Sequence, residues 1–334
     1  MAKLSENNSG DKADYTVNEV RVETYQEGMR LDAFVSAVTG FSRSFIQHLI
    51  NEGLVVSYCH QKGLKQSTKV KAGDVFQVKI PPPVELEITP EPVDFKVIYE
   101  DPHIILLDKP AGLVVHPAPG NWEKTLVHGL LYRYPEIGRI NNVIRPGIVH
   151  RLDSTTSGLM VVARNEEALS GLQLQFKKRL VTKIYLALAD GKPGNAEGQL
   201  NYPVGRSRTN RYKMAVTGSG RPSRTDYRVL WTKNNFSLIT CKLHSGRTHQ
   251  IRVHLKQACC PLVGDRLYGN KDRTRSMDHL ERIFLHSWKL GFEHPVTGEK
   301  LLFISSLPAE LVNFLRRILS RNQVPHIENP GNSM

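Results

Sequence analysis

The sequence has few cysteines, and their spacing is not typical of a metal site or a disulfide framework. Four cysteines occur in 334 residues without a CxxC pair, and two of them, Cys259 and Cys260, are adjacent. This pattern indicates neither a zinc ribbon nor structural disulfides. We therefore expect reduced thiols in a cytoplasmic protein.

Long apolar runs and a targeting pattern are also missing. No stretch approaches the run of about 18 apolar residues that a membrane-spanning helix needs. The N-terminus lacks a basic segment followed by an apolar one, which is the pattern of a signal peptide. We expect no signal peptide and no membrane partner.

Acidic residues are scarce relative to basic ones. The 32 Asp and Glu residues are outnumbered by 45 Lys and Arg, which gives a formal net charge of +13. Such an excess favours a polyanionic partner, and nucleic acid is the simplest candidate. A basic surplus that serves only solubility is the alternative.

Proline divides the chain into two parts. Five prolines fall within residues 81–92, a density that predicts an extended linker. Polar residues 1–19 predict a disordered leader, and residues 323–334 predict a loose tail. The remaining segments, 20–80 and 93–322, predict a small and a larger domain.

The small domain is predicted to contain two helices followed by short strands. Hydrophobic periodicity places Phe34, Val35 and Val38 on the inner face of the first helix. Ser42 is a suitable N-cap for the second helix.

The larger domain mixes strand and helix patterns. Helices are predicted over residues 166–179, 248–257 and 309–319. The absence of a regular βαβ rhythm favours an α+β fold with a mostly antiparallel, mixed sheet. Strands are predicted at residues 96–99, 104–107, 159–163, 183–188, 227–231, 237–243 and 301–304.

Basic side chains are concentrated between residues 206 and 224. Tyr212 and a Gly-Ser-Gly turn lie in this stretch, and no acidic residue does. Such a loop suits phosphate neutralisation and base stacking, and a solvated hairpin tip is the alternative. The six cations are Arg206, Arg208, Arg211, Lys213, Arg221 and Arg224.

A polar turn between two apolar, strand-like segments contains His150, Arg151 and Asp153. Polar side chains anchored between buried strands suit preorganised chemistry. A single Asp in a turn is more often a helix cap or a turn residue. The turn alone therefore does not identify a catalytic group.

Two other segments offer partners for Asp153. The helix predicted from Thr248 has Arg252 beside its apolar stripe, where it can approach a buried carboxylate. Three histidines nearby lack the HExxH spacing and a cysteine partner, so we expect no metal. Strand alternation places Lys183 and Tyr185 on one face, where Tyr185 either packs in the core or stacks on a flipped base.

The small domain carries a set of residues at characteristic positions: Arg30-Leu31-Asp32, Ser42-Arg43, Ile50, Gly53, Val55, Lys69-Val70 and Gly73-Asp74. A helix N-terminus at Ser42-Arg43 makes physical sense as a phosphate site. With these residues the domain resembles the S-four-type (αL) RNA-binding module of ribosomal and RNA-modifying proteins. Ser57 stands where that family usually has Asn in the strand-turn.

The larger domain contains five motifs, at residues 107–116, 150–153, 183–185, 246–254 and 285–295. With these motifs in this order the domain resembles the pseudouridine synthase superfamily, specifically the ribosomal large-subunit uridine synthases. Ser154-Thr155 departs from the Lys-Asp that is common there.

The resemblance implies an RNA pseudouridine synthase, an isomerase with Asp153 as the essential carboxylate. Asp153 then attacks C1′ or C6 or removes a proton from C2′, and these routes stay open. Arg252 is implied as its ion-pair partner, Tyr185 as the group that stacks on the uracil, Arg151 as the filler of the gap left by the flipped nucleotide, and Leu285 as pocket wall. Residues expected to bind RNA or line the pocket are Lys183, Arg43, Arg206, Arg208, Arg211 and Lys213.

The expected substrate is large-subunit (23S) ribosomal RNA, with stem-loop uridines as targets. The isomerisation is redox-neutral, so no cofactor or metal is expected, and we expect a monomer. One alternative is a catalytically inert RNA-binding ribosome-assembly factor. Another RNA-acting enzyme is disfavoured because the sequence lacks a Gly-rich cofactor loop and an acidic metal cluster.

Overall fold

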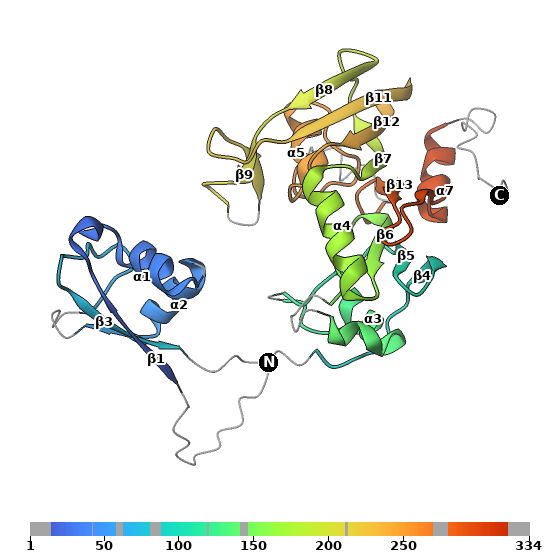
Figure 1. The fold of residues 1–334 in the computed structure, drawn as a ribbon. Helices are drawn as coiled ribbons and strands as arrows, with labels where there is room; N and C mark the ends of the chain where they lie inside the picture. Colours follow the sequence, from blue (N-terminus) through green and yellow to red (C-terminus); the bar gives the residue numbers. More distant parts are fainter. Residues whose placement is uncertain are drawn as a thin grey trace. The chain divides into compact units, whose positions relative to one another are not determined.

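A computed structural model describes residues 15–41, 43–57, 63–80, 88–118, 120–140, 146–210, 213–269 and 280–319. The chain divides into two compact units, Met1–Glu87 and Ile88–Met334 (Figure 1). Of the predicted linker, residues 81–87 lie outside the described ranges, as do residues 1–14 of the leader and the whole of the tail.

The first unit packs two helices on a three-stranded antiparallel sheet with the order β1-β3-β2. Phe34 and Phe76, both fully buried, lie at the centre of its core. Its elements are β1 (Thr16–Arg21), η1 (Thr24–Gln26), α1 (Leu31–Thr39), α2 (Arg43–Asn51), β2 (Val55–Ser57) and β3 (Val75–Ile80).

Two details of the first unit correct the sequence prediction. Because β1 begins at Thr16 and pairs with β3, the folded unit starts before the predicted boundary at residue 20. Val38 is 46% exposed rather than inward, since the buried residues of α1 all lie within its first five positions. Ser42, the predicted N-cap, lies outside the described residues.

The second unit contains a nine-stranded mixed sheet with the order β4-β5-β6-β13-β7-β12-β11-β8, and β14 pairs with β13. All strand pairs are antiparallel except β13 with β6. The predicted α+β class is therefore confirmed. The strands are β4 (Lys96–Glu100), β5 (Ile104–Lys109), β6 (Ser157–Ala163), β7 (Thr182–Asp190), β8 (Glu197–Asn201), β11 (Arg224–Lys233), β12 (Phe236–Leu243), β13 (Leu285–Glu293) and β14 (Lys300–Ile304).

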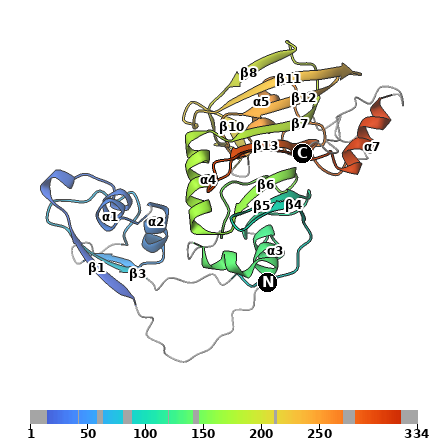
Figure 2. The same ribbon diagram turned by 45° about the vertical axis from the view of Figure 1, so that its right-hand side comes forward.

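Helices cover both faces of this sheet (Figure 2). The main core contains Tyr185 of β7 together with apolar residues of α4 and α5, whereas Leu188 of the same strand packs against α7 in a separate cluster. Side chains three positions apart on a strand point to opposite faces, so α5 and α7 lie on opposite sides of β7. The helical elements are α3 (Leu126–Arg133), η2 (Pro135–Arg139), α4 (Glu166–Lys178), α5 (Gln250–Gln257) and α7 (Ala309–Ile318).

A close approach of two backbones fixes the centre of the sheet. Gly158 of β6 has φ of 114°, and a Cβ there would lie 2.3 Å from the backbone oxygen of Ser287 in β13. Only glycine allows this contact. The parallel β6–β13 pair contains this contact and begins at Ser157, four residues after Asp153.

A separate two-stranded hairpin, β9 (Val204–Arg206) with β10 (Met214–Val216), extends from the second unit. Apolar side chains of the hairpin, Val204 and Met214 among them, pack on Val253 of α5 and on Tyr268. This packing anchors the basic loop of the sequence to the helix that carries Arg252. Among the residues that the structure describes, no helix has the length and apolar character needed to cross a bilayer.

Candidate active site

A cavity of about 410 Å³ opens on the second unit beside β7 and α5. Six predicted site residues from separate segments line it together: Arg151, Asp153, Lys183, Tyr185, Arg252 and Leu285. The sequence motifs are thus adjacent in space although they are spread over residues 151–285 of the chain.

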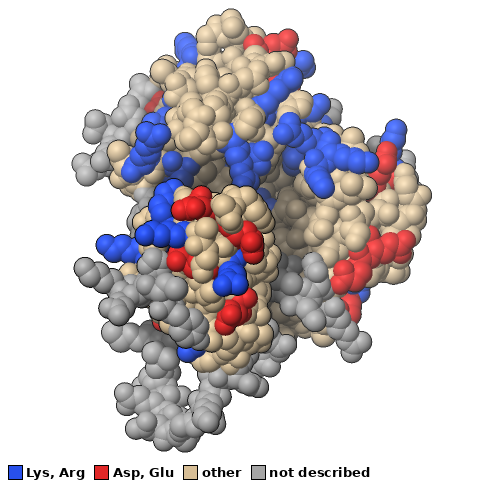
Figure 3. All heavy atoms as spheres, turned by 60° about the vertical axis from the view of Figure 1, so that its left-hand side comes forward, with Lys and Arg blue, Asp and Glu red and all other residues tan. Residues whose placement is uncertain are grey.

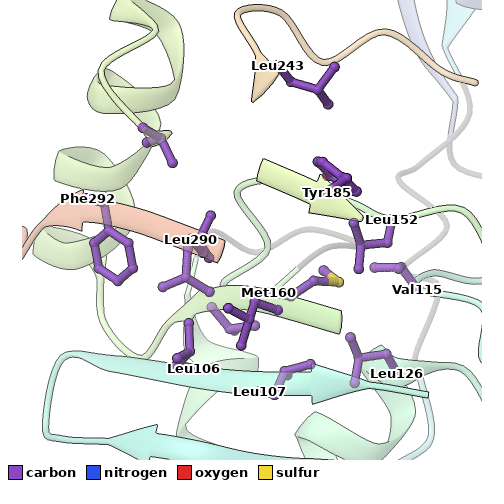
Figure 4. Packing of buried hydrophobic residues seen from close by; sticks show 14 of the residues in the cluster. Leu106, Leu107, Val115, Leu126, Leu152, Met160, Tyr185, Leu243, Leu290 and Phe292 are labelled. Carbon is purple, nitrogen blue, oxygen red and sulfur yellow. The ribbon is translucent and has the colours of Figure 1, made fainter. Parts of the chain in front are cut away.

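The turn that carries Asp153 is held rigidly. Leu152 is buried in the main core, in the cluster that also contains Tyr185 (Figure 4). The Val161 amide of β6 donates to His150 Nε2 at 3.1 Å, and the His150 ring stacks on Phe176 at 4.7 Å. Burial lowers the pKa of His150 to about 3. His150 is therefore a neutral structural acceptor that ties the turn to the sheet.

Asp153 makes a direct ion pair with Arg252. Nη1 of Arg252 donates to Asp153 Oδ2 at 3.1 Å, and the Asp153 side chain keeps 21% of its surface exposed. One carboxylate oxygen is therefore engaged by a cation while the group still faces the cavity. The geometry leaves this carboxylate available to a ligand in the cavity.

Arg252 is clamped from behind by Asp265, a residue that the sequence prediction missed. Arg252 Nε and Nη2 donate to the two Asp265 oxygens at 2.8 and 2.9 Å. The Leu267 and Tyr268 amides, each at 3.0 Å, also donate to Asp265 Oδ1. Asp265 is 1% exposed. The one clue to Asp265 in the sequence is indirect: Arg252 was expected near the core, and a buried guanidinium with five N–H donors needs more than one carboxylate.

These contacts keep Arg252 charged. Burial lowers the pKa of Arg252, but the hydrogen bonds and charges of Asp265 and Asp153 outweigh it and raise the pKa above its ordinary value. The arginine lies on α5, where Ile251 and Leu255 are buried in the core as the sequence predicted. A rigid helix thus delivers a permanent cation to Asp153.

Tyr185 and Lys183 face the cavity from β7, on the predicted shared face. Burial and the Asp153 charge raise the pKa of Tyr185 despite the opposing contribution of Ser287, so its hydroxyl remains protonated. Lys183 is 8% exposed, and its Nζ lies 5.4 Å from the ring centre of Phe176. Burial, with the nearby Arg179 charge, lowers the pKa of Lys183.

The rim of the cavity is strongly basic. Lys and Arg side chains gather on the surface of the second unit that is drawn in the upper half of Figure 3. Such a rim suits a polyanion. Its cations in the cavity lining are Arg151, Lys177, Arg179, Lys183, Arg247 and Arg252.

The β9–β10 hairpin carries the other predicted RNA-binding cations. Arg206 and Arg208 are exposed and Lys213 is half-buried, whereas Arg211 lies outside the described residues together with Tyr212. Although no acidic residue lies within the stretch, Arg224 has an acidic partner: it donates to Asp226 at 2.8 and 3.0 Å. The acid lies two positions beyond the stretch, on the same face of β11.

In the first unit, Arg43 belongs to a preorganised pair of arginines. Arg43 and Arg30 each donate two hydrogen bonds to Asp32, at 3.0 and 3.1 Å, and Gln47 donates a fifth at 2.6 Å. Asp32 is fully buried, whereas the arginine side chains are 41% and 50% exposed. Arg30, through the largest contribution, and Arg43 hold the pKa of Asp32 far below its usual value.

No group of three or more His, Cys, Asp and Glu side chains that could hold a metal ion occurs among the described residues. The groups in the cavity are a carboxylate paired with arginine, a protonated tyrosine, apolar walls and a cationic rim. They can bind a planar base and its phosphates and bring one ionised carboxylate against the sugar or base.

Comparisons with known proteins agree with this chemistry. Residues 103–257 match the family described as RNA pseudouridylate synthase. An uncharacterized RNA pseudouridine synthase of Chloroflexus aurantiacus is 45% identical over 90% of this chain and 94% of that protein. A protein of Zymomonas mobilis named ribosomal large subunit pseudouridine synthase D is 38% identical over 89% of this chain and 96% of its own length.

A solved structure supports the same assignment. Human RNA pseudouridylate synthase domain containing 1 matches with a TM-score of 0.53 and 29% identity, over 64% of this chain and 84% of the human chain. The fold and the cavity define an RNA-modifying enzyme. The chain belongs to the RNA pseudouridine synthase family, and the predicted resemblance is confirmed. It is an isomerase that converts uridine in RNA to pseudouridine.

Proposed function

We propose that this chain isomerises specific stem-loop uridines of large-subunit ribosomal RNA, with Asp153 as the essential carboxylate. The observation that carries the proposal is the Arg252–Asp153 pair, 3.1 Å apart, in a cavity with a basic rim. Relatives named ribosomal large subunit pseudouridine synthase D from Zymomonas mobilis, Neisseria meningitidis and Nitrosomonas europaea are 38–41% identical. Their names support the choice of RNA.

The reaction breaks the C1′–N1 bond of uridine, turns the uracil and rejoins it through C5. Asp153 acts by attack at C1′, attack at C6 or removal of the C2′ proton, and each route begins from an ionised carboxylate. Arg252 donates to Asp153 Oδ2 from a buried position and so places a cation against that carboxylate. Tyr185 stacks on the uracil and keeps a protonated hydroxyl for proton transfer.

The number of acids in the cavity favours isomerisation over hydrolysis. Asp153 is the single carboxylate among the described residues that line the cavity. A glycosidase needs a second one, about 5–10 Å away, to act on water or on the leaving group. Asp265 does not fill that role, because it accepts four hydrogen bonds from Arg252 and two backbone amides.

The target nucleotide must leave its helix to reach the cavity. Arg151 is exposed at the rim and is proposed to fill the gap that the nucleotide leaves. Leu285, 4% exposed, forms apolar wall, and Lys183 binds the nucleotide. The cations of the β9–β10 hairpin hold the RNA backbone.

The first unit is proposed to be the S-four-type (αL) RNA-binding module of a monomeric, cytoplasmic protein. Arg30 and Arg43 present fixed guanidinium groups because Asp32 holds both of them from the interior. Fixed guanidinium groups suit phosphate recognition. The first unit then contributes RNA affinity and the choice of uridine, and the second unit catalyses the isomerisation.

Replacement of Asp153 tests the proposal. The variant Asp153→Asn keeps the shape of the side chain and removes its charge, so carbodiimide-resistant uridine should no longer form on large-subunit rRNA. RNA affinity should stay within about threefold, because the cationic rim is unchanged. Asp94→Asn, at an exposed position of the same unit, is the matched control. Retained turnover in Asp153→Asn would refute the role.

A further inference from the structure

His249 lies directly beside Asp153, although its sequence context suggested only a possible metal ligand. It is the N-cap of α5 and has a left-handed backbone, with φ of 57°. Its Nε2 is 3.7 Å from Asp153 Oδ2, and its side chain is 18% exposed. A non-glycine residue in this conformation is uncommon and is often found at functional sites.

The other ring nitrogen of His249 is held by Tyr268. His249 Nδ1 lies 2.8 Å from the Tyr268 hydroxyl oxygen, which also accepts the Met214 amide of β10 at 2.7 Å. Tyr268 is 4% exposed, so its hydroxyl proton needs a partner within the protein. Among the described residues, His249 Nδ1 is the acceptor within reach.

This chain of hydrogen bonds determines the tautomer of His249. The Met214 amide can only donate, so it occupies one lone pair of the Tyr268 oxygen. The hydroxyl then donates to Nδ1, and the proton of the neutral imidazole must lie on Nε2. That N–H faces Asp153.

The surroundings also keep the ring neutral. Burial lowers the pKa of His249, and the Arg252 and Arg151 charges act in the same direction, which outweighs the opposing contributions of Asp153 and Asp265. A neutral ring offers Asp153 a hydrogen bond rather than a proton.

We propose that His249 is a positioning residue that donates its Nε2–H to Asp153 Oδ2 when RNA closes the site. This inference rests on the proposed role of Asp153. The present separation exceeds a hydrogen bond by about 0.5 Å, and such contacts often tighten only in the substrate complex. Arg252 and His249 then both hold Oδ2 and leave Oδ1 for the nucleotide.

The arrangement also links the basic hairpin to the chemistry. Met214 lies in β10, directly after Lys213, and packs in the cluster that contains Tyr268. The position of the hairpin on α5 therefore determines, through Met214 and Tyr268, which nitrogen of His249 carries the proton.

Two substitutions of His249 by amide side chains separate its hydrogen bond to Asp153 from its packing against Tyr268. The Nε2 of Gln overlays the imidazole Nε2, so His249→Gln keeps a donor toward Asp153. The amide of Asn reaches only the position of Nδ1, so His249→Asn keeps a partner for Tyr268 and loses the donor. Asn also tolerates left-handed φ better than most residues, so a loss of activity in His249→Asn does not arise from backbone strain.

The single-turnover rate on a large-subunit rRNA transcript is the measurement. We expect His249→Asn to lose about 10- to 100-fold in the rate constant at saturating RNA, in line with a displaced catalytic group, with unchanged RNA affinity and thermal midpoint. His249→Gln should stay within about threefold of the wild type. His103→Gln, a replacement of the same type outside the cavity lining, should behave as the wild type.

Equal activity of His249→Asn and the wild type would overturn the inference, as would equal losses in the Asn and Gln variants. Tyr268→Phe gives an independent reading, since it removes the group that orients the ring; a rate equal to that of the wild type would also contradict the inference. Asp153→Asn is measured in parallel. If it stays active, the proposed function itself fails; if it is inactive and His249→Asn is fully active, only the role of His249 fails.

Discussion

Asp265 gives the sharpest test of how the site is built, because no substrate contact is expected of it. The change Asp265→Asn removes the charge behind Arg252 and places an N–H₂ group against guanidinium donors that are now 2.8 and 2.9 Å from carboxylate oxygens. Arg252 and Asp265 are 9% and 0% exposed in their side chains. The pair is therefore almost fully desolvated.

The expected loss of stability follows from that burial. Removing one partner of a buried ion pair lowers the free energy of unfolding by about 3–5 kcal/mol, since the remaining charge stays in a low-dielectric environment. A typical domain is stable by only about 5–15 kcal/mol. Asp265→Asn should therefore lower the free energy of unfolding by an amount that denaturant titration easily resolves.

A double replacement separates the buried charge from the packing. In Asp265→Asn/Arg252→Met no buried cation is left without its clamping carboxylate, so the double variant should be more stable than Asp265→Asn alone. Both variants should be inactive in single-turnover assays, since neither presents a correctly held Arg252 to Asp153. The free energy of unfolding of the single variant Arg252→Met is measured as well. If the double variant loses as much free energy of unfolding as the two single variants together, the paired-charge explanation is wrong.

The remaining predictions concern Tyr185 and Lys109. Tyr185→Phe keeps the stacking ring and removes the hydroxyl, so the single-turnover rate should fall at unchanged RNA affinity; an unchanged rate would mean that the hydroxyl has no part in catalysis. Burial lowers the pKa of Lys109 to about 7, below its value in the unfolded chain, so this lysine should make unfolding free energy rise as pH increases from about 7 to 10.5. Lys109→Met should remove this contribution to the slope of unfolding free energy against pH. If the wild type and the variant show the same pH dependence, the lowered pKa of Lys109 is contradicted.

Much of the site could be predicted from the sequence because its chemistry lies in local motifs. Asp153, Tyr185 and Arg252 each occur in a short pattern that constrains the residue type at one position. Their meeting in one cavity is confirmed by the geometry. Their separate catalytic roles remain predictions.

The residues that were missed depend on contacts between distant segments. Asp265 is a single acid in a turn, and its importance appears only when the Arg252 donors are counted against their acceptors. His249 was visible as one of three histidines, but its tautomer depends on Met214, which lies 35 positions earlier. No local periodicity encodes such a contact.

Strand prediction failed at β13, where polar residues are buried. Six of the nine residues of β13 are buried, because the strand lies between β6 and β7 in the middle of the sheet. His286 and Ser287 are among them, so the sequence of this strand shows neither a continuous apolar run nor a period of two. The short strands β8, β9 and β10 were missed for a different reason, since each has at most one buried residue.

The Asp153 turn is held from three directions, which explains how one carboxylate can be sufficient. Leu152 anchors it in the core, His150 accepts an amide of β6, and Lys109 donates to the Ser154 carbonyl at 3.1 Å. The same lysine donates to two carbonyls of its own loop at 2.8 Å. A turn fixed on both sides of Asp153 limits the carboxylate to rotation about its own side-chain bonds. The free energy of RNA binding is then not needed to order the backbone of this turn, and it is available to extrude the nucleotide.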